Sequence, residues 1–209
     1  MIRPLLVGVA AVALTLSACQ RNETETAESP GQTEPVNKAQ DAMSAAVGTV
    51  SAATLGQTVE GYVTNAAISD MYEIEAGKLA QEKGQSPAVK EFGGMIVKDH
   101  TASSTEMKPL VTAAGQTPPT EMDERRKGMI DNLRAASGAD FDRTFITQQI
   151  SAHEEALNLH SGFAQDGGDA GLKAFATKTA PVIQKHLEHV RGMQGAAEAA
   201  PAGAAAPAK

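Results

Sequence analysis

The chain has 209 residues, a net charge of −7, a single Cys and no Trp, and only 3% of its residues are aromatic. This length suits one ordinary domain with terminal extensions. The scarcity of aromatic residues favours packed helices over a β-sandwich. The negative charge argues against a surface for nucleic acid, so no nucleic-acid partner is expected. The lone Cys excludes an internal disulfide framework.

Residues 1–18 have the pattern of an export signal. Arg3 provides a positive start, and the apolar run from Leu5 to Leu16 is too short to span a membrane. The run ends in the letters LSAC, which resemble the lipobox of bacterial lipoproteins. In that motif the Cys, here Cys19, becomes the first residue of the mature protein and carries lipid. The alternative is an ordinary secretory signal that happens to contain a Cys.

The lipobox interpretation predicts a protein exported to the periplasmic face of the cell envelope, with lipidated Cys19 as its membrane anchor. In lipoproteins of this pattern, Asp after the Cys favours retention in the inner membrane. Here Gln20 follows, which favours the outer membrane over the inner one. Residues 19–57 begin with a segment rich in Glu, Thr, Pro and Gln, which cannot bury a core. We expect a flexible tether there, and a marginal helix within it stays an open alternative.

The central segment, residues 58–194, shows the periodicity of helices. Long helices are expected at about 58–83, 87–114, 139–165 and 169–193, and a short helix between about 120 and 137. Ser86-Pro87 and Asp169 provide helix starts. Residues 195–209 form an Ala- and Pro-rich tail that we expect to be disordered.

The spacing of these helices predicts the fold class. The first two long helices, and the last two, are separated by only a few residues, whereas the middle connection is long. This pattern predicts an all-α, ferritin-like four-helix bundle of two helical hairpins joined by a long connection containing a short helix. Whether the chain runs up-down-up-down or crosses over in the middle is left open. The Gly93-Gly94 pair is expected to permit close packing of two helices.

The candidate site residues come from the position of the histidines along the helices. His100 interrupts an otherwise apolar stripe. It lies roughly 14 residues after the first hairpin turn, and His153 lies roughly 14 before the second, so both fall near mid-bundle. Glu75 and His186 lie within about a turn of that level. Because metal sites in bundles are built from polar side chains that converge on the core, these four residues are candidate metal ligands.

This hypothesis has two alternatives and is accompanied by two further expectations. A buried His100 could instead bond Ser103, Ser104, Gln149 or Glu75 in a metal-free polar network. The His186-x-x-His189 pair could hold Zn or Cu at the surface. His160 is expected to be solvated or capping. The carboxylates of three further residues are interpreted as surface charges: Glu73, Asp99 and Glu154.

Catalytic motifs are not evident in the sequence. Di-iron carboxylate bundles use Glu-x-x-His, but Val97 stands three residues before His100 and Ile183 three before His186. The only Cys lies in the lipobox, and no Gly-rich phosphate loop follows a strand. We therefore predict a protein that is not an enzyme.

Three separated blocks carry a family resemblance: AAISDMYEIEAGKLAQEKGQSPAVKEFGGMIVKDHTAS, DFDRTFITQQISAHEEAL and LKAFATKTAPVIQKHLEHV. They resemble the bacterial domain of unknown function 4142 over about Val59–Val190. Its recurrent motifs are matched by Lys98-Asp99-His100-Thr101, by His153-Glu154, and by Pro181 with His186-Leu187. The resemblance implies a ferritin-like bundle in an exported or outer-membrane protein. It implies no reaction, because none is assigned to the family.

Three functional hypotheses follow. The first is a lipid-anchored envelope bundle that acts as a non-enzymatic binding or structural module and requires no cofactor. The second is a metal-binding ferritin-like protein that uses Glu75, His100, His153 and His186 to hold Fe, Mn or Zn for metal handling or stress response. The third is an interaction module that docks an envelope protein partner. The sequence sets no oligomeric state.

Overall fold

The computed structural model describes residue 43 and residues 58–199. The predicted signal, the tether apart from Met43, and residues 200–209 lie outside the described residues. The described part is all-helical, which confirms the predicted fold class. Its helices are α2 (Val59–Lys83), α3 (Pro87–Ala113), α4 (Glu124–Ala135), α5 (Gly138–Asp166) and α6 (Ala170–Ala199).

Local side-chain chemistry sets the helix boundaries. Thr58, Ser86, Asp123 and Asp169 each precede a helix, and their side chains accept a hydrogen bond from a backbone N–H of its first turn. Helix α6 continues to Ala199, past the expected end near residue 193. The segment beyond that point is rich in Ala, the strongest helix former, so nothing local stops the helix there.

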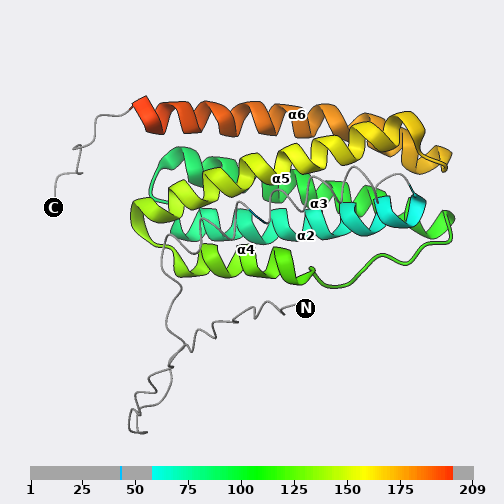
Figure 1. The fold of residues 1–209 in the computed structure, drawn as a ribbon, viewed down its shortest axis with the longest axis horizontal. Helices are drawn as coiled ribbons and strands as arrows, with labels where there is room; N and C mark the ends of the chain where they lie inside the picture. Colours follow the sequence, from blue (N-terminus) through cyan, green and yellow to red (C-terminus); the bar gives the residue numbers. More distant parts are fainter. Residues whose placement is uncertain (1–42, 44–57, 200–209) are drawn as a thin grey trace, which may run out of the picture. The chain divides into compact units, whose positions relative to one another are not determined.

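The helices pack as two hairpins, α2 with α3 and α5 with α6. Between the hairpins, α2 also packs against α5, and α3 against α6. Following the colours in Figure 1, α2 and α6 run in one direction along the bundle, and α3 and α5 run in the other. Every packed pair of long helices is therefore antiparallel, while α3 and α5 are parallel. The connection between them must return along the bundle, which selects the crossover topology.

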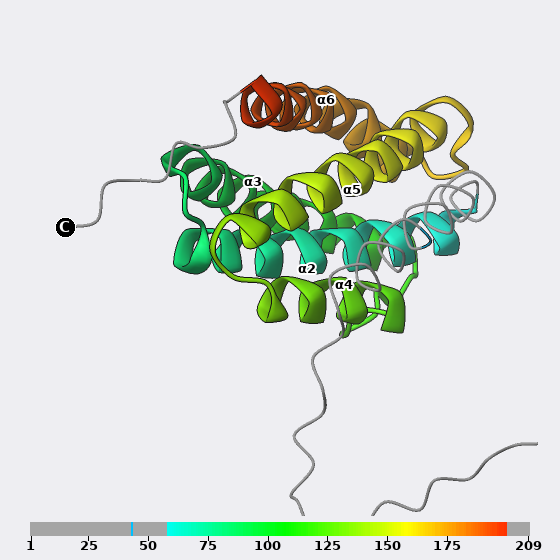
Figure 2. The ribbon, with the colours of Figure 1, turned by 60° about the vertical axis from the view of Figure 1, so that its left-hand side comes forward.

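The short helix α4 lies on that returning connection. It packs against α2 and α5, and Figure 2 shows it on the side of the bundle opposite α6. The long connection is therefore not a loose loop, because it covers the outer faces of α2 and α5.

The apolar core is divided into two clusters. One includes Phe92, Ile96 and Leu187, and the other includes Met107 and Phe175. Along α3, α5 and α6 the residues between the clusters include buried histidines. A polar layer thus separates two apolar ends of one bundle.

Helices α2 and α3 approach closely at Gly93, opposite Gly77. A Cβ on Gly93 would lie 2.7 Å from the Ala80 Cβ and 2.7 Å from the Gly77 carbonyl oxygen. A Cβ on the neighbouring Gly94 would meet nothing closer than Gln81 Oε1 at 3.6 Å. Gly93 therefore permits the close approach of the two helices, and Gly94 does not take part in it.

This contact predicts opposite effects of two neighbouring substitutions. Gly93→Ala should lower the free energy of unfolding by about 1–3 kcal/mol, because overpacking forces the helices apart. Gly94→Ala should leave it unchanged or raise it by up to about 1 kcal/mol, because Ala favours the helix. Urea denaturation of both variants measures the difference. Equal stability of the two variants would contradict the close contact at Gly93.

Candidate metal centre

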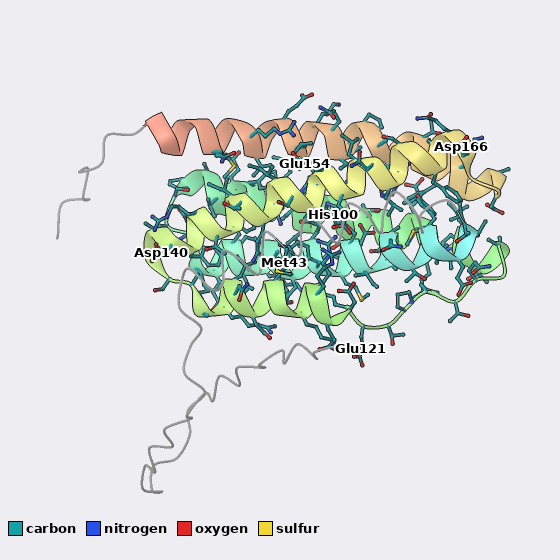
Figure 3. All side chains as sticks on the ribbon, in the orientation of Figure 1. Met43, His100, Glu121, Asp140, Glu154 and Asp166 are labelled. Carbon is teal, nitrogen blue, oxygen red and sulfur yellow. The ribbon has the colours of Figure 1, made fainter. Side chains whose placement is uncertain are left out.

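Three histidines from three helices meet in the polar layer. His100 of α3, His153 of α5 and His186 of α6 are all buried, and one ligand atom from each lies within 4.8 Å of the others. Figure 3 shows His100 midway between the bundle ends that Asp140 and Asp166 mark. The structure therefore brings together three of the four predicted ligands, at the predicted height.

The ring of His100 is held by an aspartate of α2. His100 Nδ1 lies 2.8 Å from Asp70 Oδ1, and Ser104 Oγ donates to the other carboxylate oxygen at 2.9 Å. A carboxylate accepts only, so Nδ1 must carry the hydrogen. His100 Nε2 is buried and has no hydrogen-bond partner among the described residues. This carboxylate–histidine arrangement is the one that orients histidine ligands in metal sites.

The other two rings are held in the same way. His153 Nδ1 donates to the backbone oxygen of Gln149, one turn earlier, at 2.9 Å. His186 Nε2 lies 3.0 Å from Asp99 Oδ2. We call the ring nitrogen that faces its own acceptor, here His153 Nδ1 and His186 Nε2, the outer nitrogen, and the other nitrogen of each ring the inner one. If each outer nitrogen carries a hydrogen, the inner nitrogens, His153 Nε2 and His186 Nδ1, are both without one. Those two atoms are 3.4 Å apart.

Two bare nitrogens at this distance repel one another unless a cation lies between them. The other neutral tautomer of His186 would relieve the repulsion, but it would turn a bare Nε2 towards the Asp99 carboxylate. A tetrahedral ion with metal–nitrogen bonds of about 2.0–2.1 Å separates its ligand atoms by about 3.3 Å. The observed spacing matches that separation, and it also lies within the range of an N–H···N hydrogen bond between the two rings.

The charge states of two of the three rings suit a metal ion. Burial, with a further contribution from His100, lowers the pKa of His153 to about 3. Burial, together with neighbouring His153 and His100, lowers the pKa of His186 to about 4. Both rings are therefore neutral near pH 7, which is the form that binds metals. For His100, burial acts to lower the pKa, but the hydrogen bond to Asp70 and the charges of Asp70, Glu73 and Asp99 together outweigh burial, and the pKa is raised. A metal ion at His100 Nε2 would therefore displace a proton from that ring.

A buried carboxylate lies beside the histidines. Glu73 of α2 is 1% exposed, its Oε1 lies 3.7 Å from His153 Nδ1, and neither oxygen has a hydrogen-bond partner among the described residues. Burial raises the pKa of this carboxyl, and His100 is the strongest of the charges that oppose the rise. The interpretation of Glu73 as a surface charge was wrong.

The fourth predicted ligand, Glu75, is not at this site. Its carboxylate is partly exposed and accepts a hydrogen bond from Arg134 at 2.9 Å. The predicted buried face of α2 was wrong. The face that the structure buries includes Tyr62, Ala66, Ser69, Glu73, Ala76 and Ala80. The alternating steps of four and three residues along small side chains were the available signal for Glu73.

The remaining predicted surface groups have mixed outcomes. Asp99 is about one-third exposed, but it is the hydrogen-bond partner of His186. Glu154 is half-exposed and forms an ion pair with Arg191, as expected of a surface charge. His189 is exposed and lies against the Phe92 ring, so it does not join buried His186 in a surface metal pair.

His160 is buried, contrary to the expectation that it would be solvated or capping. Its Nδ1 lies 2.9 Å from the Tyr62 hydroxyl group. Burial lowers the pKa of His160 to about 4, so the neutral ring accepts the hydrogen bond from the phenol. The prediction failed because the hydrogen-bond partner, Tyr62, lies far away in the sequence, on α2.

Comparison with known proteins adds the family. The family model described as domain of unknown function (DUF4142) matches residues 26–193, which is most of the chain. The chain belongs to this family. No curated protein matches the DUF4142 chain at a significant level, and no solved structure does. The family assignment confirms the resemblance seen in the sequence, and its description names no activity.

Burial of neutral His160 predicts a loss of stability in acid. In the unfolded chain the ring takes up a proton near pH 6.5, whereas in the folded chain it does so only near pH 4. The unfolded state therefore binds more protons in this window, and stability falls as the pH falls through it. The decrease of the pKa from 6.5 to about 4 corresponds to about 3 kcal/mol at most.

The variant His160→Gln keeps an acceptor for Tyr62 but removes the titration. When the pH is lowered from 7 to 4, the free energy of unfolding should fall in both the variant and the wild type. The fall should be smaller in the variant, by up to about 3 kcal/mol. Denaturation at a series of pH values measures this difference. His189→Gln, at an exposed position, is the matched control and should follow the wild-type profile. Parallel profiles for all three proteins would refute the assignment of a buried neutral His160.

Proposed function

We propose that this DUF4142 protein binds one divalent transition-metal ion through His100, His153 and His186. One observation carries the proposal: each ring has its outer nitrogen bonded to its own acceptor, so that the inner nitrogens converge in the core. The 3.4 Å separation of two of them supports a shared ion. A metal-free polar network would place a hydrogen between those atoms, and the acceptors at the outer nitrogens oppose that arrangement.

The ligand chemistry narrows the choice of ion. Neutral imidazoles suit Zn, Cu, Fe and Ni, whereas Mn prefers carboxylate and water ligands. Of the ions named from the sequence, Zn²⁺ and Fe²⁺ therefore fit better than Mn²⁺. Two carboxylates, Asp70 and Asp99, hold the ligand rings from outside and offset part of the ion's charge. Metal binding is thus preferred over a purely structural role for the bundle, and the absence of Glu-x-x-His still argues against ferritin-type oxidation.

We further propose that Cys19 carries lipid and anchors the bundle to the periplasmic face of the cell envelope. The LSAC sequence at the end of an apolar run of signal length supports this proposal. Within residues 58–199, none of the helices combines the length and the apolarity needed to cross a bilayer.

The metal proposal predicts a stoichiometry and a set of dependent residues. The full chain, purified without a polyhistidine tag and stripped with a chelator, should bind about one Zn²⁺ per chain. Loss of a residue that only orients a metal ligand typically weakens metal binding about 10–100-fold. Loss of a ligand itself should weaken Zn²⁺ binding by at least as much, and this is expected of His100→Ala, His153→Ala and His186→Ala. Asp70→Asn should weaken binding within that range. Elemental analysis and calorimetric titration provide the two readouts.

Two substitutions serve as controls for these variants. Glu75→Ala and His189→Ala remove a carboxylate and an imidazole that lie outside the three-histidine cluster, and both should bind Zn²⁺ as the wild type does. A wild-type chain that stays metal-free with Zn²⁺, Fe²⁺, Cu²⁺ and Ni²⁺ would refute the proposal. Loss of binding in the two controls would also refute it.

The anchor proposal predicts that a single substitution abolishes lipidation. In a bacterial host, the wild-type chain should sediment with membranes, and Cys19→Ser should be recovered in the soluble periplasmic fraction or retain its signal. Metabolic labelling with a fatty acid should mark the wild type alone. Labelling of the Ser variant would contradict lipidation at Cys19.

A further inference from the structure

Three imidazoles leave one position of a tetrahedral ion unoccupied. The side chain that fills it must be close to the histidines, shielded from water and free of other bonds. Ligands already come from α3, α5 and α6. Helix α2 is the long helix that has none, although it packs against both α3 and α5.

Glu73 of α2 meets these conditions. It is 1% exposed, and its Oε1 lies 3.7 Å from His153 Nδ1, which donates to the Gln149 backbone and is not one of the three converging nitrogens. Neither carboxylate oxygen meets hydrogen-bond geometry with a described residue. Buried carboxylates in proteins are paired, hydrogen-bonded or bound to metals. A buried carboxyl group beside three converging imidazoles is therefore a candidate metal ligand.

The groups that face Glu73 from the other helices do not satisfy it. His100 of α3, Arg126 of α4 and His186 of α6 oppose the rise of its pKa through their charges. The Gln149 side chain of α5 opposes the rise as a hydrogen-bonding neighbour, although its amide does not meet hydrogen-bond geometry. Arg126 forms an ion pair with Glu155 through Nη2 at 3.0 Å. Its Nε and Nη1 atoms, and the side-chain amide of Gln149, are buried and have no hydrogen-bond partners among the described residues. Glu73 thus forms no ion pair with the Arg126 guanidinium, and among the described residues its one close basic neighbour is the His153 ring.

We propose that Glu73 is the fourth ligand of the metal ion and closes the site. The inference rests on the proposed three-histidine function. The Glu73 carboxylate lies outside the group of three histidine nitrogens, so its side chain rotates towards them when the ion binds. The resulting set is three nitrogens and one oxygen. Hydrolytic zinc sites keep one position open for water, so a site closed by Glu73 retains its ion rather than activating water.

The test uses Co²⁺ as a visible probe in the untagged full chain, because tetrahedral Co²⁺ absorbs more strongly than Co²⁺ with more ligands. The wild type should give intense bands that added azide leaves unchanged, since no position is open. Glu73→Leu should bind Co²⁺ at least about tenfold more weakly, and azide should then shift its spectrum by entering the vacated position.

Two further variants keep the result interpretable. Glu75→Leu removes the exposed carboxylate two residues away and should match the wild type in affinity and in its indifference to azide. Glu73→Gln keeps the size of the side chain and should also weaken binding about tenfold, so it replaces the Leu variant if that variant does not fold. Apo Glu73→Leu should melt no lower than the apo wild type, because the substitution removes an unpaired buried acid.

The outcomes separate the two proposals. A wild-type spectrum that responds to azide, together with unchanged affinity in Glu73→Leu, would overturn the role of Glu73 and leave the three-histidine site standing. It would indicate that Glu73 faces Arg126 instead. A wild type that binds neither Co²⁺ nor Zn²⁺ would overturn both. Weaker binding and new azide sensitivity in the Glu73 variants alone would establish the fourth ligand.

Discussion

Three hydrogen bonds on the outer sides of three imidazoles constrain the centre of this bundle. Asp70, the Gln149 backbone and Asp99 each accept from one ring, so the rings must turn their other nitrogens inwards. The polar layer that these rings form divides the apolar core into two clusters. Because bare nitrogens and an unpaired carboxyl group are costly to bury, an occupant that joins these atoms would stabilise the layer. The proposed divalent cation would do so by bonding to all of them.

The crossover topology makes this layer possible. It places every long helix antiparallel to the two that it packs against, so that residues from the middle of each helix meet at one level (Figure 1). The Asp70–His100 bond joins α2 to α3, and the Asp99–His186 bond joins α3 to α6. The ligand rings are thus attached to rigid helices and to bonds between helices, which is how a site keeps its geometry before a ligand arrives. Asp99 is also partly exposed, so the path from solvent to the site is short on this side.

Much of the fold was accessible from the sequence, because helix boundaries are set locally. Ser86 and Asp169 cap helices where the sequence placed them, and the family resemblance proved correct. The convergence of the histidines was also predictable, because height along a helix follows from counting residues. Rotation about the helix axis was harder. The prediction selected Glu75 by its height along α2, which does not decide the face of the helix. The structure instead buries the face of small residues that carries Glu73. The partners that orient each ring lie on other helices or on the backbone, and no local pattern in the sequence identifies them.

The most direct test of the account is a crystal structure of the chain grown with Zn²⁺, with diffraction recorded on both sides of the zinc absorption edge. The account predicts one anomalous peak in the bundle core, within about 2.0–2.1 Å of His100 Nε2, His153 Nε2 and His186 Nδ1. An empty position among these three atoms in zinc-soaked crystals, with the rings unmoved, would contradict it. Zinc found only at surface carboxylates would also contradict the three-histidine site. The histidines would then form a metal-free polar layer.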